Sequence, residues 1–425
     1  MARTIARSRL VYCLWLIFLA CEGAGSGAGG LRISQDTIGD TIIVRTLAGS
    51  VWGEPRGLLA DLKIGELEGA DPYAFGDIRS LAVGPDGSIY VYDAQAKQLR
   101  KYASDGTFVA VFGREGGGPG EYRNPDGGLA ATADGRVWLR DPGNGRINIY
   151  SPDGTYLNEA RVRGSFSTSR RLYSDTAGNV YSSLSLNPVF DPVDRREALL
   201  RYDRAGSPRD TLAAPVYEEP PSLVARREND GSHLSSSRPV PFSPSANWAY
   251  SPLGYFVGGL PTDYAIDLYR PEGVLRIGRA FESVTIDPRE REDAERRATA
   301  IMRQIDPDWR WNGPAIPDTK PPYRSFFIGE DGRIWVQLHQ RGVEREHGET
   351  EAHGGSVPEP RWYEPVAFDI FEADGRYLGQ VAGPRGLSLY PTPVARGDTL
   401  WAVLRDDLDV PYIERYRITA IADVD

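Results

Sequence analysis

Cysteine is nearly absent from this chain of 425 residues, and its absence excludes two kinds of site. Both cysteines, Cys13 and Cys21, lie within the first 21 residues. The chain beyond them therefore has neither disulfides nor thiolate metal ligands. Histidine is almost as scarce, so a three-histidine metal site would need nearly every histidine present. The four histidines are His233, His339, His347 and His353.

Positive charge is outweighed by negative charge, with 49 Lys and Arg against 59 Asp and Glu and a formal net charge of −10. The first twenty residues carry three arginines and no acid, so without them the charge becomes 46 − 59 = −13. Affinity for nucleic acids comes from basic patches, so we predict no nucleic-acid partner. A content of 40% hydrophobic and 25% charged residues is typical of a folded protein.

Hydrophobic runs are short, and the longest, LVYCLWLIFLA at residues 10–20, cannot span a bilayer as a helix. It follows three arginines, a pattern that predicts a signal peptide over residues 1–20. The run ends in FLAC, which favours a lipoprotein signal with lipidation of Cys21. Ordinary cleavage further on, inside GAGSGAGG, is the alternative. We expect a flexible tether at residues 21–38 and membrane contact only through a lipid anchor.

Internal repeats dominate the rest of the sequence. LAVGPDGSIYVYD and LAATADGRVWLRD contain Asp-Gly pairs at residues 86–87 and 134–135, which are 48 residues apart. A second Asp-Gly pair recurs at the same spacing, at residues 105–106 and 153–154. Each unit alternates short apolar-polar runs with glycine turns, which predicts strands joined by hairpins. Repeats of this size, with four strands each, predict a β-propeller.

We therefore predict an all-β fold, a six-bladed β-propeller over residues 39–425. The sixth blade has only three strands of its own. We expect a strand at residues 40–46 to supply its outer edge and close the ring. A helix is predicted between blades 4 and 5. The predicted blades are at about 76–113, 124–160, 169–213, 245–285, 322–383 and 388–420.

The glycine-rich segment FGREGGGPGEY at residues 112–122 has two interpretations, a phosphate-binding loop or a turn. A phosphate loop needs Gly-Lys-Ser/Thr followed by a helix. Here Pro119 and Glu121 occupy that region and a strand follows. We therefore interpret the segment as the connection between blades 1 and 2.

The segments FGREGGGPGEYRNPDG, IYVYDAQAKQLRKY and GNGRINIYSPDGTYL resemble NHL-repeat six-bladed propellers. More closely, the chain is similar to bacterial secreted six-bladed β-propeller proteins whose function is largely unassigned. The resemblance is carried mainly by residues 76–160. It implies the fold rather than the function, because propellers host both binding and catalysis. Some six-bladed relatives are metal-dependent lactonases or lyases.

The long insertions of the predicted propeller all fall on one face, opposite the tight Asp-Gly turns. They comprise residues 186–196, 214–243, 287–322 and 340–362. Such a face is typical of binding, and tolerated surface length is the alternative. One insertion contains DPREREDAERRATAIMRQI, in which Asp287 suits an N-cap and Pro288 the first helical turn. This helix serves as a fixed packing element or as a lid.

Three arginines share a position in this pattern, at the start of the innermost strands on the inserted face. They are Arg79 in blade 1, Arg170 in blade 3 and Arg324 in blade 5. Guanidiniums gathered around a channel mouth would favour a small anion, such as a carboxylate or an acidic sugar. The alternative is structural pairing with acids such as Asp77 and Asp126.

Aromatic residues near the same face include Trp248, Tyr390, Trp309 and Trp311. They either stack on a ligand or cover the core beneath the insertions. The acidic segment EHGETEAHGG is a conceivable metal site, but a solvated hairpin explains it better. Asp93 and Asp141 end equivalent strands, where we expect them to fix the turn and pair with arginines such as Arg100.

These patterns favour a protein of the bacterial cell envelope, lipid-anchored or otherwise secreted or periplasmic. It would bind a small anionic ligand or a protein partner on its inserted face. We predict no catalytic residue, no metal ligand and no cofactor, and we expect a monomer. One alternative is a metal-dependent hydrolase or lyase with a divalent ion in the central channel. The other is a purely structural surface scaffold.

Overall fold

The computed structural model describes residues 30–67, 71–161, 171–186, 196–229, 232–345 and 357–421, apart from the side chains of residues 229, 232 and 233. The predicted signal peptide and Cys21 lie outside the described residues. No helix in the described part of the chain combines the length and the apolar character that a bilayer span requires.

Strands that follow one another in the chain pair into antiparallel units of four, which we number in chain order. Unit 1 contains β4 (Ile78–Val83), β5 (Ile89–Asp93), β6 (Gln98–Tyr102) and β7 (Phe108–Phe112). Unit 2 contains β10 (Leu129–Ala131), β11 (Val137–Asp141), β12 (Arg146–Tyr150) and β13 (Tyr156–Arg161). Unit 3 contains β14 (Leu172–Ser174), β15 (Val180–Ser185), β16 (Glu197–Tyr202) and β17 (Pro208–Ala213).

The second half of the chain repeats this pattern with two long interruptions. Unit 4 contains β20 (Asn247–Tyr250), β21 (Phe256–Gly259), β22 (Ala265–Arg270) and β23 (Gly273–Arg279). Unit 5 contains β24 (Tyr323–Ile328), β25 (Ile334–Leu338), β28 (Ala367–Phe371) and β29 (Tyr377–Ala382). Unit 6 contains β31 (Val394–Arg396), β32 (Thr399–Arg405), β33 (Pro411–Ala420) and β3 (Arg56–Ile64), and the short β30 (Leu387–Ser388) also pairs with β32.

The Asp-Gly turns have the geometry that the repeat predicts. Gly87 and Gly135 adopt φ of 82° and 80°, a left-handed conformation that glycine accepts without steric cost. In unit 1 the Asp86 carboxylate accepts the Ser88 amide at 3.0 Å, which closes the turn. In unit 2 the Asp134 carboxylate accepts the Arg136 amide in the same way. Each sequence pair thus fixes a tight hairpin between the first two strands of its unit.

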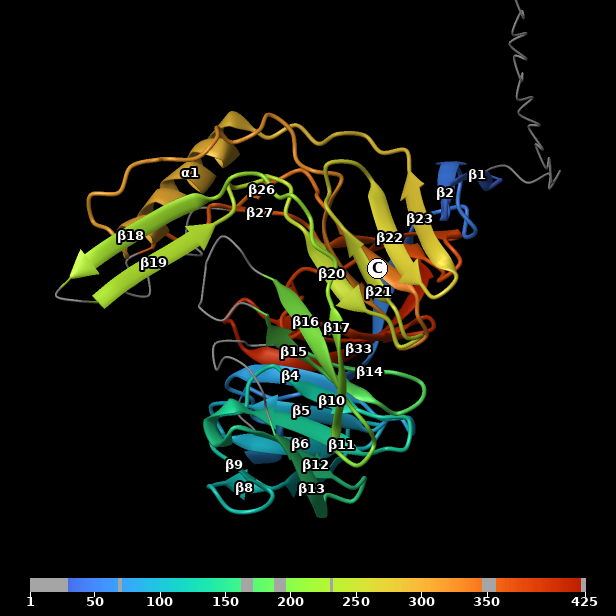
Figure 1. Ribbon diagram of the computed structural model, residues 1–425, viewed down its shortest axis with the longest axis vertical. Coiled ribbons are helices and arrows are strands. Elements are labelled where there is room, and N and C mark those ends of the chain that lie inside the picture. Colours follow the sequence, from blue (N-terminus) through green and yellow to red (C-terminus); the bar gives the residue numbers. More distant parts are fainter. Residues whose placement is uncertain are drawn as a thin grey trace, which may run out of the picture.

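Neighbouring units contact one another through their first strands. β4 contacts β10, β10 contacts β14, β20 contacts β24, and β31 contacts β4. Backbone hydrogen bonds make the two other links: Thr176 N to Pro252 O at 3.1 Å joins units 3 and 4, and Glu330 N to Ala395 O at 2.8 Å joins units 5 and 6. Apolar clusters fill the spaces between neighbouring sheets. The protein is therefore nearly all-β, with a propeller-type fold (Figure 1).

The N-terminal segment pairs differently from the prediction for residues 40–46. Strand β2 (Thr41–Ala48) runs parallel to β23, and β1 (Arg32–Ile38) lies beyond it, so both extend unit 4 (Figure 1). The outer strand of unit 6 is β3, whose Leu58 and Ile64 are buried. The predicted closing strand is therefore wrong, and residues 32–38 form a strand where we expected tether. The runs that form β2 and β3 are both short and contain several apolar residues. The alternation of apolar and polar residues alone does not indicate which sheet edge each of them joins.

The predicted helix α1 (Pro288–Arg303) lies between units 4 and 5, with the Asp287 side chain accepting the Arg289 amide. It packs with the hairpin of β18 (Leu223–Asn229) and β19 (Ser232–Arg238), and the short β26 (Val343–Glu344) and β27 (Trp362–Tyr363) lie nearby (Figure 1). Met302 and Trp309 are buried in its apolar cluster. This burial supports the interpretation of α1 as a fixed packing element.

A buried charged cluster ties this layer to unit 5. The Lys320 ammonium donates to the carboxylates of Glu290 on α1 at 2.6 Å and Glu364 at 3.0 Å. It also donates to the Gln340 carbonyl at 2.9 Å, and its side chain has no solvent exposure. His339 contacts Glu364 at 3.0 Å. Three loops and the helix are thereby held by one group of charges.

The glycine-rich segment connects units 1 and 2 as a closed turn. Its ends pair as β8 (Arg114–Glu115) and β9 (Glu121–Tyr122), and the Glu121 carboxylate accepts the Gly118 amide at 2.8 Å. At Gly113 a Cβ would lie 2.5 Å from the Gly120 carbonyl oxygen, so the turn has no room for a side chain. The prediction of a turn is confirmed.

Asp93 and Asp141 hold the chain where it enters units 1 and 2. Asp93 accepts the amides of Gly76 and Asp77 at 3.0 and 3.1 Å. Asp141, which is fully buried, accepts the amides of Arg123 and Asn124 at 3.0 and 2.8 Å. The expected structural role of both carboxylates is confirmed.

Candidate functional site

A cavity of about 760 Å³ lies among the first strands of all the units. Its lining comes from β4, β10, β14, β20, β24 and β31 and from the residues that flank them. One end, which we call the turn end, lies at the Asp-Gly turns. The opposite end, which we call the insertion end, lies where the chain enters each unit. Volumes of this size are typical of small-molecule sites.

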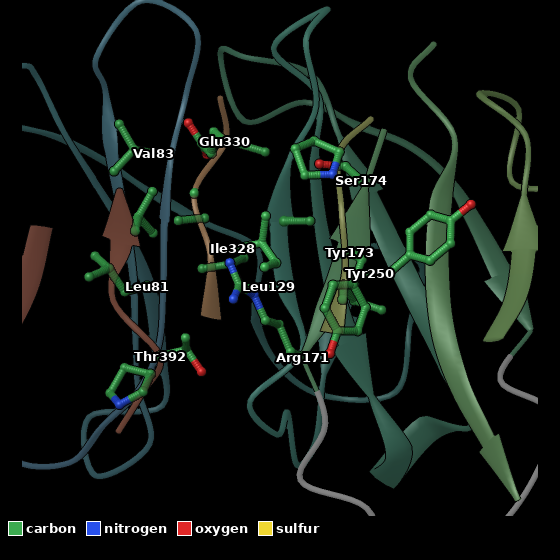
Figure 2. Close-up of a pocket in the computed structure, with 18 of the residues that line it drawn as sticks. Leu81, Val83, Leu129, Arg171, Tyr173, Ser174, Tyr250, Ile328, Glu330 and Thr392 are labelled. Carbon is green, nitrogen blue, oxygen red and sulfur yellow. The ribbon is translucent and has the colours of Figure 1, made fainter. Parts of the chain in front are cut away.

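One wall of the cavity is apolar. Leu81, Val83, Leu129 and Ile328 line it, and Figure 2 shows them around the central space. They are at most 6% exposed. Their burial stabilises the contacts between units, so the wall is rigid and preformed.

The wall of units 3 and 4 is aromatic. Tyr173 and Trp248 stack with ring centroids 6.2 Å apart and an interplanar angle of 30°. Tyr250 packs edge-on to Tyr173 at 6.5 Å. Tyr173 and Tyr250 thus form an aromatic side of the cavity, away from Leu81 and Val83 (Figure 2). Trp248 and Tyr390, both predicted site residues, line this cavity, and Tyr390 is 55% exposed.

Arg171 is the basic side chain that reaches into the middle of the cavity, as Figure 2 shows. Its guanidinium carbon lies 5.7 Å from the centre of the Tyr173 ring, a cation–π contact. Within the described part of the chain it has no hydrogen bond and no ion pair. Burial lowers the pKa of this guanidinium, and the negative charge of Glu330 opposes that effect. An arginine stays protonated even so, which leaves a partly buried positive charge without a direct counterion among the described residues.

The turn end is bridged by an ion pair between units 5 and 6. Arg396 Nε lies 2.8 Å from a Glu330 carboxylate oxygen. Arg396 also donates to the Gly84 carbonyl of unit 1 at 3.1 Å. Burial raises the pKa of Glu330, and Arg396 opposes this rise. Glu330 is thus already engaged with one arginine when it faces Arg171.

Of the three arginines predicted to surround the channel, one lines the cavity and one does not. Arg79 lines the cavity, but its Nε donates to Asp77 at 2.8 Å, so the predicted structural pairing is present. Arg324 is exposed and does not line the cavity. Arg170 lies outside the described residues. The arginines that the fold brings to the cavity are Arg79, Arg171 and Arg396.

The sequence contained a partial signal for the central arginine. Arg170 and Arg171 are adjacent, and the repeat pattern predicts the first of the two as a site residue. The turn of unit 3 closes as that of unit 1 does, with Gly178 N donating to Asp175 O as Gly87 N donates to Gly84 O, so the two turns are equivalent. Counted back from these glycines, Arg171 stands at the position of Ser80 in unit 1, one residue after the position that Arg79 and Arg324 share.

The described residues offer no cluster of metal ligands. Among them, no group of three or more His, Cys, Asp or Glu side chains is arranged to hold a metal ion. His339 is engaged with Glu364, beside Lys320. The segment with His347 and His353 lies outside the described residues, as does the side chain of His233.

Comparisons with known proteins give no family assignment. No family model matches the chain. No curated protein matches it either. Among solved structures, a DUF4221 family member from Bacteroides vulgatus is similar over 86% of this chain and 99% of its own, with 8% identity and a TM-score of 0.48.

Two enzymes are among the other similar structures. A gluconolactonase from Xanthomonas campestris is similar over 86% of this chain and 99% of its own, with 13% identity and a TM-score of 0.39. A virginiamycin B lyase from Staphylococcus aureus is similar over 84% and 98%, with 10% identity and a TM-score of 0.38. Likeness at this level does not extend to activity or ligand.

Proposed function

We propose that this protein is a six-bladed β-propeller, closed by β3, that binds a small anionic ligand in its central cavity. The succession of contacts from β4 around to β31 supports the ring. The pairing of β3 with β33 supports closure by the N-terminal part of the chain. The resemblance to NHL-repeat proteins agrees with this architecture and does not specify the ligand.

The observation that carries the proposed function is the position of Arg171. Removing a guanidinium from water costs free energy that is recovered only when the charge is paired and hydrogen-bonded. Arg171 has a cation–π contact with Tyr173 and otherwise faces the cavity. A carboxylate can accept two parallel hydrogen bonds from a guanidinium, and such bonds are among the strongest in proteins.

The surrounding charges favour an anion rather than a cation. The positive charges of Arg396 and Arg171 both favour the ionised form of a single carboxylate, that of Glu330. Arg396 is directly bonded to this carboxylate, which leaves one positive charge to be matched. Two further acids, Asp175 and Glu197, line the cavity. Asp175 accepts hydrogen bonds from Asn179 and Tyr181, and Glu197 lies on the third strand of unit 3.

The cellular context of this function follows from the N-terminal sequence alone. Export, and lipidation of Cys21, are proposals that rest on the predicted signal in residues 1–20. The acidic net charge likewise supports a protein that acts without nucleic acid and as a monomer. A protein partner on the inserted face remains the other class of ligand that the sequence suggested.

Thermal unfolding in the presence of small anions tests the proposal. Wild-type protein and Arg171→Met would be heated with acetate, benzoate, D-glucuronate, phosphate and divalent cations. Met is close in length and apolar, so it fits between Tyr173 and the aliphatic wall. We expect at least one carboxylate to raise the melting temperature of the wild type, because a ligand stabilises the state that it binds. The same ligand should leave Arg171→Met unchanged.

Arg324→Met is the matched control, because Arg324 is exposed and outside the cavity. It should respond to ligands as the wild type does. If no anion stabilises the wild type, or if Arg171→Met responds equally, the proposed function is wrong. Stoichiometric divalent metal in the purified protein, together with stabilisation by divalent cations alone, would instead support the metal-dependent hydrolase or lyase alternative.

A further inference from the structure

The walls of the cavity carry information about the ligand beyond its charge. This inference rests on the proposed function, because it concerns the same cavity. Leu81 lies across the cavity from Tyr173, with Arg171 between them (Figure 2), and Trp248, which stacks on Tyr173, also lines the cavity. A flat, apolar body fits between two such walls, because it buries area against both of them.

Several polar groups on the walls are engaged within the protein. The Thr132 hydroxyl donates to Asp134 at 2.5 Å. The side-chain nitrogen of Asn247 donates to the Ser245 carbonyl oxygen at 3.0 Å. Asp175 accepts from the Asn179 backbone amide at 2.8 Å. A polyhydroxylated sugar needs several free partners, since each buried hydroxyl without one costs free energy.

The charge balance restricts the ligand further. The guanidinium of Arg79 is already paired with Asp77, and that of Arg396 with Glu330. Arg171 is the central cation without an ion-pair partner among the described residues, so the space beside it accommodates one negative charge. A second charge on the ligand would need a partner of its own, because burial of a charge without one is costly.

From this geometry we infer that the cavity selects an aromatic or similarly flat apolar monocarboxylate, rather than an acidic sugar or a multiply charged anion. The carboxylate pairs with Arg171, and the ring lies between the aromatic and the aliphatic walls. The volume of about 760 Å³ leaves ample room for a bicyclic ring. The sequence alone left carboxylates and acidic sugars as equal candidates, and the composition of the walls distinguishes them.

A matched set of ligands tests this selectivity by isothermal titration calorimetry with the full-length protein. The probes are 2-naphthoate, its uncharged counterpart 2-naphthamide, D-glucuronate and citrate. We expect 2-naphthoate to bind at least about tenfold more tightly than each of the others. The amide lacks the charge, the glucuronate lacks the apolar ring, and the citrate carries surplus charge.

Two variants locate the ring. Trp248→Leu keeps the wall apolar but removes its flat surface, and it should weaken 2-naphthoate about fivefold to tenfold while leaving acetate unchanged. Phe281→Leu is the aromatic control, because Phe281 is 38% exposed and does not line the cavity, and it should change the affinity less than threefold. Circular dichroism would verify that both variants are folded.

The outcomes separate the two proposals. If D-glucuronate binds as tightly as 2-naphthoate and its binding depends on Arg171, the anion site is supported and the inference about the ring is wrong. If Trp248→Leu leaves the affinity for 2-naphthoate unchanged, the placement of the ring is wrong. If no carboxylate binds, the proposed function and this inference both fail.

Discussion

Lys320 provides the sharpest prediction about stability, because four segments of the chain depend on its charge. Its ammonium lies 2.6 Å from Glu290, 3.0 Å from Glu364 and 2.9 Å from the Gln340 carbonyl oxygen. The Glu290 and Glu364 side chains are only 5% and 11% exposed. Lys320→Met would leave two carboxylates buried beside each other without their shared cation. Breaking a buried pair in this way costs about 3 to 5 kcal/mol.

The loss of stability in Lys320→Met should be largest where Lys320 connects α1 to unit 5. We therefore predict that amide hydrogen exchange in α1 accelerates at least about 100-fold in Lys320→Met, the equivalent of roughly 3 kcal/mol. Lys97→Met is the matched control, since Lys97 pairs with Glu115 on the surface and both side chains are about half exposed. It should change stability by less than about 1 kcal/mol. Equal exchange rates in α1 for the two variants would refute the role assigned to Lys320.

Three further changes test the rest of the structure. Burial raises the pKa of Glu364, but His339 and other donors outweigh it and lower the value from 4.5 to about 2. The ionised carboxylate therefore stabilises the fold above pH 4.5, and this stabilisation is lost as the pH falls toward 2. In urea unfolding, the free energy of unfolding of the wild type should exceed that of Glu364→Gln by about 3 kcal/mol at pH 7 and by about half that at pH 3. Leu58→Ala in β3 should lower the free energy of unfolding by about 2 to 5 kcal/mol in the same assay, and Ile42→Ala in β2 should lower it by less than about 1 kcal/mol. The reverse order would contradict closure by β3. Gly113→Ala should lower the melting temperature clearly more than Gly145→Ala, because both have positive φ but only Gly113 is crowded, and equal shifts would contradict the crowding.

Local sequence signals predicted the features that depend on local chemistry. The Asp-Gly pairs specify their turns, since glycine adopts the positive φ and the aspartate accepts the nearby amide. Asp287 and Pro288 specify the start of α1 in a similar way. Alternating apolar residues then predict the strands between these turns. The nearly all-β, propeller-type fold followed from these signals together with the 48-residue repeat.

Features that depend on contacts across the chain were missed or misplaced. The edges of units 4 and 6 could each accept a strand, and the sequence does not state that β2 joins one edge and β3 the other. The Glu330–Arg396 pair joins residues 66 positions apart and has no local pattern. Arg171 stands at the position of Ser80 in the repeat, so a pattern of arginines one residue earlier does not include it.

The affinity of 2-naphthoate for wild-type protein, Arg171→Met and Arg324→Met, measured by calorimetry at one salt concentration, tests the central claim most directly. Truncating one partner of a buried charged pair costs about 2 to 5 kcal/mol, so Arg171→Met should bind at least about 30-fold more weakly than wild type. Arg324→Met should bind as wild type does. Equal dissociation constants for all three proteins would contradict an anion site at Arg171.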